Sequence, residues 1–258
     1  MKIYCLMENT STCDDFLCEH GLSFFIETSK HKILFDMGQS DGFIENANKL
    51  GLDLGMVDIA IISHGHYDHG GGLKSFLEVN SIAPIYVSRH AFLPHYNGTQ
   101  KYIGLDSSLK DNKRIIFTDD TINIDTGITI FNTNQRKNKF DLGSFGLTVL
   151  KNCEYLPDDF CHEQYLLIEE NHNRILFSGC SHRGILNIAD LYLADTIVGG
   201  FHFSKLPLDS TLDSYAKYLD SFDTKYYTCH CTGVTQYEYM KKQMKNLSYI
   251  SSGDIIEV

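Results

Sequence analysis

Residues 57–72 read VDIAIISHGHYDHGGG, and this stretch decides what kind of fold the chain forms. A largely apolar run, residues 57–62, is followed by three histidines and one aspartate within six positions. A near-continuous apolar run is typical of a strand that is covered on both faces of its sheet. Polar residues directly after such a strand lie at the edge of the sheet, where the binding sites of layered α/β folds tend to form. The stretch therefore predicts a functional site at the end of a buried strand.

The residue types in this stretch are those that bind metal ions. Alternate residues of an extended segment point the same way, so His64 and His66 are expected to share one ion. Asp68 and His69 follow and are expected to hold a second ion close by. Imidazole and carboxylate groups suit Zn²⁺, with Fe or Mn²⁺ as alternatives. The competing interpretation, histidines in an exposed loop, fits a lone H-x-H better than this longer motif after a buried strand.

Composition limits the classes of protein that this chain can be. The 258 residues are 43% hydrophobic and contain no long linker, so we expect one domain over residues 1–258. The net charge of -11 disfavours binding to a nucleic acid backbone. No apolar run is long enough to span a membrane, and the eight cysteines form no compact disulfide framework. We therefore expect a cytosolic protein with reduced thiols and no membrane or nucleic acid partner.

The chain contains an internal repeat. Residues 20–38, HGLSFFIETSKHKILFDMG, align without a gap with residues 162–180, HEQYLLIEENHNRILFSGC. Each copy reads as a β-hairpin, and each is followed by a helix-like segment and an apolar strand that ends near a histidine, His64 or His202. The repeat predicts an α/β fold of two similar halves that pack sheet to sheet with helices outside, unless the similarity arose by chance. Residues 91–150 are expected to form a less regular insertion.

The motif at residues 64–69 resembles the HxHxDH signature of the metallo-β-lactamase superfamily. The segments ILFDMG, HEQYLLIE, FSGCSHRGILNI, VGGFHF and HCTG resemble the branch named after 7,8-dihydropterin-6-methyl-4-(β-D-ribofuranosyl)aminobenzene-5′-phosphate synthase. The resemblance covers most of the chain. It implies a four-layer αβ/βα sandwich of two similar halves, in agreement with the repeat.

The resemblance also implies a set of metal ligands. His64 and His66 match the pair that binds the first ion of the superfamily. Asp68 and His69 match the pair that binds the second ion, and His230 matches the last histidine of the superfamily, another ligand of that ion.

The chain departs from the superfamily pattern at two positions. Cys180 stands where many members have an aspartate that bridges the two ions. His182, two residues later, is the preferred remaining ligand. His162 lies near the usual third ligand of the first ion, but the residues around it differ from the common pattern. Whether His162 or Cys180 also binds metal, and whether one or two ions bind, stays open.

The sequence also predicts roles for several other residues near these motifs. His202 follows a strand and is expected either to contact the substrate or act as a general acid, or to have no role in the site. Cys229 and Cys231 flank His230, and a Cys-His-Cys zinc site is one alternative, but the alternation of an extended segment favours packing residues that point away from His230. Asp36 is expected to orient a ligand histidine. The remaining histidines are predicted to be surface or turn residues: His20, His31, His90, His95 and His172.

These observations predict a metal-dependent hydrolase, or a related lyase-like enzyme, that uses a metal-activated water. Asp68 would orient the nucleophile, and His202 or His182 would stabilise the developing oxyanion or protonate the leaving group. The resemblance implies a small, phosphorylated or pterin-like substrate. Two alternatives are a di-iron redox protein of the same fold and a non-catalytic, metal-stabilised binding module. The oligomeric state is not predicted.

Overall fold

The computed structural model describes residues 1–258. In it, the apolar run before His64 forms strand β4 (Ile59–Ile62), which lies inside a seven-stranded sheet. All four residues of β4 are buried, as expected for a strand covered on both faces. The pairs β3–β4, β4–β5 and β5–β8 are parallel. The strand order of this first sheet is β18 (Ile255–Glu257), β1 (Lys2–Met7), β2 (Ser23–Glu27), β3 (Lys32–Phe35), β4, β5 (Ile85–Ser88) and β8 (Ile115–Thr118).

A second seven-stranded sheet repeats this arrangement. Its strand order is β17 (Leu247–Tyr249), β16 (Lys225–Thr228), β15 (Thr196–Gly199), β14 (Asn173–Ser178), β13 (Tyr165–Glu170), β10 (Ile128–Phe131) and β9 (Ile122–Asp125). Both copies of the sequence repeat form antiparallel hairpins, β2–β3 and β13–β14. Each hairpin is followed by a parallel strand, β4 or β15. The prediction of two similar halves is therefore confirmed.

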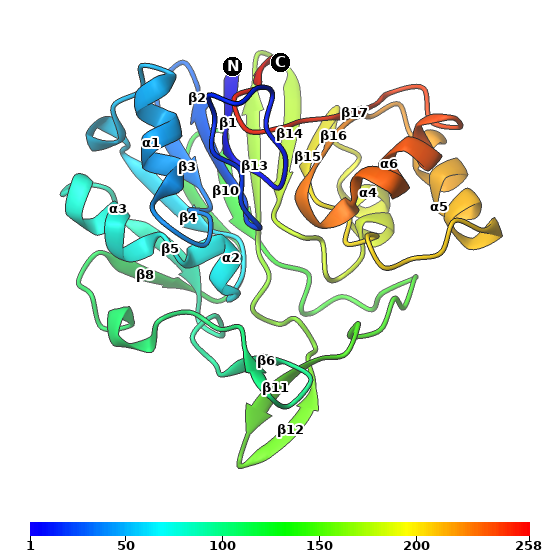
Figure 1. Ribbon diagram of the computed structural model, residues 1–258, viewed down its shortest axis with the longest axis horizontal. Helices are drawn as coiled ribbons and strands as arrows, with labels where there is room; N and C mark the ends of the chain where they lie inside the picture. Colours follow the sequence, from blue (N-terminus) through cyan, green and yellow to red (C-terminus); the bar gives the residue numbers. More distant parts are fainter.

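The helices cover the outer faces of the two sheets (Figure 1). Helices α1 (Gly42–Lys49) and α3 (Leu73–Val79) pack on the first sheet, where Phe43 and Phe76 share a core cluster with Leu34. On the second sheet lie α4 (Ile185–Tyr192), α5 (Ser210–Asp220) and α6 (Val234–Lys241). A third cluster fills the space between the sheets. The result is the predicted four-layer αβ/βα sandwich.

Aromatic residues join the two sheets in the central layer. The ring of Phe177 lies 5.9 Å from that of Phe35 and 6.5 Å from that of Phe24, measured between ring centroids. Such pairs contribute about 0.5–1.5 kcal/mol each beyond the burial of their area. They hold the two halves in a fixed relation, and so help to position the loops at the edges of both sheets.

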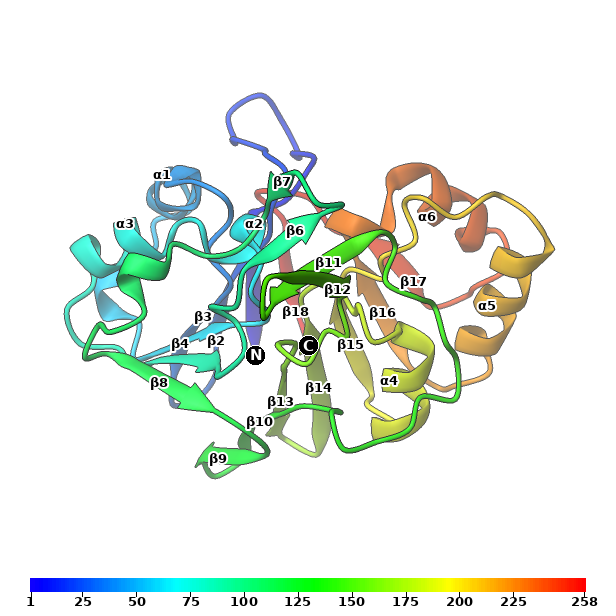
Figure 2. The ribbon, with the colours of Figure 1, turned by 90° about the horizontal axis from the view of Figure 1, so that it is seen from below.

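A small antiparallel sheet extends beyond the ends of the main sheets (Figures 1 and 2). Its strand order is β12 (Glu154–Pro157), β11 (Leu147–Lys151), β6 (His95–Asn97) and β7 (Lys101–Tyr102). The expectation that residues 91–150 form one insertion is wrong in part. β8 pairs with an edge of the first sheet, and β9 and β10 belong to the second. Their apolar pattern is too short to reveal this pairing, which depends on the open edge that each sheet offers.

The remaining helical segments are short. They are α2 (Tyr67–Gly70), which carries part of the HxHxDH motif, and three 3-10 turns at Leu54–Met56, Ser107–Leu109 and His230–Thr232. None of the helices combines the length and the apolar character that crossing a bilayer requires.

Candidate metal centre

Three histidines from different parts of the chain meet at the edge of the two sheets. His64 and His66 come directly after β4, and His182 lies in the loop after β14. One nitrogen of each imidazole lies within 4.8 Å of the other two. The ring centroid of His182 is 4.9 Å from that of His64 and 4.9 Å from that of His66. The pair expected to share the first ion, His64 and His66, and the preferred remaining ligand, His182, therefore lie together.

Four nitrogens of these imidazoles have no hydrogen-bond partner, whereas Nδ1 of His64 lies 2.9 Å from Oγ of Ser63. Nε2 of His64, Nε2 of His66 and both nitrogens of His182 are buried without a hydrogen bond. Burial lowers the pKa of each of the three imidazoles well below the ordinary value. They are therefore neutral, which is the form that binds metal. Buried polar atoms are rarely left unpaired, so the donor set fits a metal ion such as Zn²⁺.

A second cluster surrounds Asp68. Its Oδ2 lies 3.4 Å from Nε2 of His230 and 3.2 Å from Nε2 of His20. Nε2 of His69 lies 3.2 Å from Nε2 of His230 and 3.2 Å from Sγ of Cys180. Burial alone raises the pKa of Asp68, but the neighbouring His69, His20 and His230 outweigh burial and hold it well below its ordinary value. Asp68 is therefore an ionised carboxylate in a group of potential ligands.

Asp36 supports His69 from behind. Oδ2 of Asp36 lies 2.7 Å from Nδ1 of His69, and Oδ1 accepts a hydrogen bond of 2.7 Å from the amide of Ser63. The expected contact of Asp36 with a site histidine is therefore confirmed. Because Nδ1 is engaged, Nε2 of His69 is the nitrogen that faces the cluster.

Two other buried carboxylates hold the loops that carry His182 and His230. Oε1 of Glu163 accepts a hydrogen bond of 2.7 Å from the amide of His182, and Oε1 of Glu8 accepts one of 2.6 Å from the amide of His230. Nδ1 of His230 lies 2.7 Å from Oδ1 of Asn9, which can only accept, so Nδ1 donates. Nε2 of His230 is thus the nitrogen directed toward Asp68.

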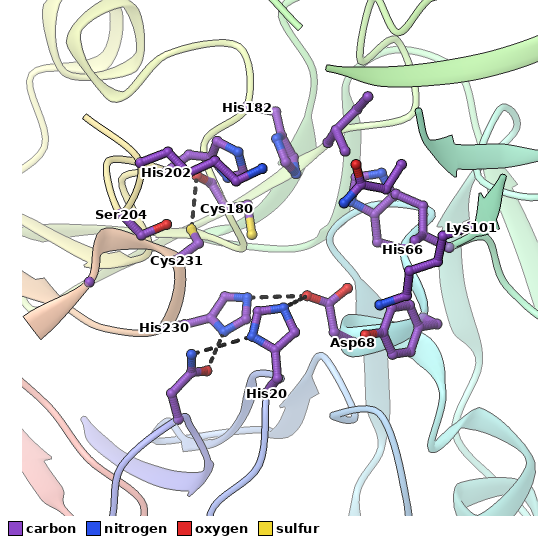
Figure 3. A pocket seen from close by; sticks show the side chains of 17 residues that line it. His20, His66, Asp68, Lys101, Cys180, His182, His202, Ser204, His230 and Cys231 are labelled. Atoms are coloured by element: carbon purple, nitrogen blue, oxygen red, sulfur yellow. Dashed lines mark hydrogen bonds and ion pairs between the residues drawn. The ribbon is translucent and has the colours of Figure 1, made fainter. Parts of the chain in front are cut away.

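A cavity of about 280 Å³ opens above both clusters, and side chains from both halves of the chain point into it (Figure 3). His202 lies on the side of the cavity formed by the second half, with its ring centroid 4.2 Å from that of His182. Nδ1 of His202 is buried without a hydrogen-bond partner. Lys101, from the small antiparallel sheet, lines the opposite side of the cavity. The cavity has the size of a small-molecule site.

Of the five remaining histidines, the surface prediction is wrong for His95, whereas His20 is a surface residue as predicted but also contacts the site. His20 is partly exposed, but it contacts Asp68, and its ring centroid is 4.9 Å from that of His230. His95 is buried, with Nδ1 2.7 Å from Oδ2 of Asp158. The repeat was an overlooked signal for His20, because His20 begins one copy as His162 begins the other; no local signal marks His95. The other three lie outside helices and strands and are at least partly exposed: His31, His90 and His172.

The two cysteines beside His230 differ in their surroundings. Cys229 is fully buried in the core between the sheets, so the expectation of a packing residue is confirmed. Cys231 was expected to point away from the site, and this is wrong. Its side chain lines the cavity, and Sγ lies 3.5 Å from the carbonyl oxygen of Cys180. The reason is the 3-10 turn at His230–Thr232, which breaks the alternation of a strand.

Comparison with known proteins identifies similar chains over the full length. The family described as the metallo-beta-lactamase superfamily matches residues 18–151. An uncharacterized protein of Methanocaldococcus jannaschii is 29% identical over 98% of this chain and 98% of its own. A second protein of that organism, 7,8-dihydropterin-6-methyl-4-(β-D-ribofuranosyl)-aminobenzene-5′-phosphate synthase, is 26% identical over 100% of this chain and 96% of its own.

Solved structures share the fold. A metal-dependent hydrolase of the β-lactamase superfamily superposes with a TM-score of 0.86 and 29% identity, covering 100% of this chain and 99% of the other. Zn²⁺-bound PqqB from Methylobacterium extorquens covers all of both chains with a TM-score of 0.63 and 11% identity, which is a likeness of fold alone.

Proposed function

The chain belongs to the metallo-β-lactamase superfamily, and on that premise we propose that it is a metal-dependent hydrolase of a small-molecule substrate. The observation that carries the proposal is the set of unpaired, buried nitrogens of His64, His66 and His182 beside a cavity. A protein core that needed these residues only for packing would leave few such atoms without partners. The similarity to a solved metal-dependent hydrolase at 29% identity also supports it.

Two ion positions follow from the two clusters. His64, His66 and His182 would hold the first ion, and Asp68, His69 and His230 would hold the second. When bound, a divalent ion supplies an activated water near neutral pH and Lewis-acid polarisation of the electrophilic oxygen of the substrate. Zn²⁺ is the proposed ion because imidazole and carboxylate ligands suit it, and Fe and Mn²⁺ remain alternatives.

Asp68 and His202 are the proposed proton acceptor and proton donor. Figure 3 shows them on opposite sides of the cavity. The ionised Asp68 carboxylate can orient the attacking water and accept its proton. Nδ1 of His202 has no protein partner, so a leaving group across the cavity can receive a proton from it. An attack from the Asp68 side with departure toward His202 would use both groups.

The proposed substrate is small and phosphorylated or pterin-like. The cavity volume supports a small molecule, and the charge of -11 disfavours a nucleic acid. The name of the second relative, which contains both a dihydropterin and a phosphate, supports this substrate class. A synthase reaction, as in that name, is the second candidate function, and the similarity over the whole chain is the observation that favours it.

The test is metal analysis of protein purified without added metal, followed by hydrolysis assays with simple phosphoesters, thioesters and lactones. The proposal expects bound metal and turnover that a chelator abolishes and Zn²⁺ restores. Metal without any turnover would favour the synthase or a binding module, and iron with a visible absorption band would favour a redox protein. His172→Ala, an exposed turn residue, is the matched control for substitutions of the site histidines.

A further inference from the structure

His162 is the end of a buried network that the proposed chemistry does not use. Nδ1 of His162 accepts a hydrogen bond of 2.9 Å from the amide of Gly65, the residue between His64 and His66. Nε2 of His162 lies 3.5 Å from Oδ2 of Asp158, a contact between polar atoms that is too long for a hydrogen bond here. The same carboxylate oxygen lies 2.7 Å from Nδ1 of His95.

The hydrogen bond from Gly65 decides which nitrogen of His162 carries the proton. The amide can only donate, so Nδ1 of His162 must accept and has no proton. The proton of the neutral ring is therefore on Nε2, where it faces the Asp158 carboxylate. His162, Asp158 and His95 are all buried, so water does not compete for these contacts. Nδ1 is held by the hydrogen bond from Gly65, whereas Nε2 makes no hydrogen bond and is held only by the contact with Asp158 and by the His95 ring, whose centroid is 4.0 Å away.

These residues could alternatively bind a metal ion together with His66, since their ligand atoms lie within 4.8 Å of one another. The distance between Nδ1 of His95 and Oδ2 of Asp158 speaks against this. Two ligands at 2.0–2.1 Å from one tetrahedral ion are about 3.3 Å apart. The observed 2.7 Å is the length of a charge-assisted hydrogen bond. The geometry therefore favours a hydrogen-bonded support.

We propose that His162 is a positioning residue and not a metal ligand: it holds the Gly65 amide and thereby sets the directions of His64 and His66. The ring of His95 packs against that of His162, with centroids 4.0 Å apart, and Asp158 contacts Nε2, so both restrict the orientation of the ring. Gly65 has no room to adjust in another way, because a Cβ there would collide with the backbone of Ala91. Rotation of the Gly65 peptide would change the directions of the His64 and His66 side chains, so that their nitrogens would no longer converge with those of His182. The inference rests on the metal site proposed above.

Three substitutions separate positioning from ligation. His162→Asn places an amide oxygen close to the position of Nδ1, so it can still accept from Gly65, but it has no group near Nε2. His162→Gln reaches toward Nε2 and lacks the acceptor near Nδ1, and His162→Ala lacks both. We expect the Asn variant to bind Zn²⁺ within about threefold of the wild type in a competition with a chromophoric chelator. The Ala and Gln variants should lose roughly 10–100-fold in affinity, the range for disturbed support of a metal ligand.

The number of ions bound at saturating Zn²⁺ distinguishes a positioning role of His162 from a role as a metal ligand. Positioning predicts the same stoichiometry in the wild type, the three His162 variants and Asp158→Asn. If His162→Asn and His162→Ala each bind one ion fewer, His162 is a ligand and the proposal is overturned. If Asp158→Asn binds one ion fewer, the network is itself a metal site, and the proposal is equally overturned.

A metal-free measurement separates this inference from the proposed function. Hydrogen exchange of the Gly65 amide, measured by NMR in the presence of chelator, should be slow in the wild type and in His162→Asn, and at least tenfold faster in His162→Ala. Equal protection in all three would refute the positioning role even if the protein binds metal. Failure of the wild type to bind any metal, with the exchange pattern as expected, would refute the metal site and leave the contact to Gly65 intact.

Discussion

Asp36 and His69 form a fully buried pair, with Oδ2 of the carboxylate 2.7 Å from Nδ1 of the imidazole. Burial lowers the pKa of His69, but the charges of Asp36 and Asp68 outweigh burial and raise it overall. The pair keeps a proton on Nδ1 and turns Nε2 toward His230 and Cys180. One carboxylate at the end of β3 thus determines which atom His69 offers to the second ion position.

Asp36→Asn tests this support. The amide can still contact Ser63 but loses the charge that holds the proton on Nδ1 of His69. We expect Zn²⁺ affinity to fall by roughly 10–100-fold, as for other residues that orient a metal ligand. Asp58→Asn is the control, since Asp58 contacts His31, a histidine outside the site. Equal effects of the two substitutions, measured by chelator competition, would contradict the role of Asp36.

His66→Ala tests the HxHxDH motif itself. The substitution removes one nitrogen from the first cluster, so metal content should fall by about one ion per chain and hydrolysis should be lost. The fold should survive, because three core clusters remain and His66 belongs to none of them. Metal analysis, an activity assay and circular dichroism, with His172→Ala alongside, measure these outcomes. Full metal content and full activity would exclude His66 as a ligand.

Substitutions of His182 and Cys180 test which of the two residues in the loop after β14 binds metal. Both nitrogens of His182 are buried and unpaired, whereas burial raises the pKa of the Cys180 thiol well above its ordinary value and keeps it protonated. His182→Ala should therefore reduce metal affinity and activity by at least 10–100-fold, and Cys180→Ser much less. Metal stoichiometry and rate are compared at one pH. An empty site in Cys180→Ser with a filled site in His182→Ala would instead indicate a thiolate bridge.

Substitution of Asn9 is expected to affect only the second ion position. Asn9→Ala removes the acceptor for Nδ1 of His230, so we expect about tenfold weaker binding of one ion and unchanged binding of the other. Asn9→Asp keeps an acceptor oxygen and should stay within a few-fold of the wild type. Titration with Co²⁺, followed by absorbance, resolves the two binding steps. A loss of both ions in Asn9→Ala would mean that the substitution disturbs more than His230.

The buried neutral histidines predict a pH dependence of stability in the metal-free protein. Burial lowers the pKa of His64, His66 and His182 well below 6.5, and burial together with His95 lowers that of His162 to about 4. In the unfolded chain these groups take up protons near pH 6.5. Each therefore contributes stability that is fully present above about pH 6.5 and decreases at lower pH, by up to about 1.4 kcal/mol per pH unit.

His69 acts in the opposite direction, because its raised pKa stabilises the fold at low pH and that contribution is lost as the pH rises. Since four groups oppose one, the free energy of unfolding should fall between pH 7.5 and pH 5.5. Urea unfolding in the presence of chelator at three pH values measures it. His162→Asn, which has no imidazole, should show a shallower slope. Stability that is constant or rises over this range would contradict the burial of neutral imidazoles.

Much of the architecture was predictable because it depends on local periodicity. The apolar run before His64 predicts a strand buried on both faces, and the two copies at residues 20–38 and 162–180 predict two hairpins at equivalent places. The HxHxDH spacing brings His64 and His66 together within one short segment. Each of these predictions requires only residues that are neighbours along the chain.

The sequence by itself thus determined the two halves, the strand ends and the residue types at the edge between them. Only the tertiary structure decided which side chains from different loops meet there. His20 contacts Asp68, and His95 contacts Asp158, because packing brings distant segments to one edge, and no local pattern encodes that distance. The same packing brings His182 to His64 while the hydrogen bond from Gly65 engages His162. Side-chain partners across two sheets depend on how the whole core fits together, whereas strands depend on the alternation of a few consecutive residues.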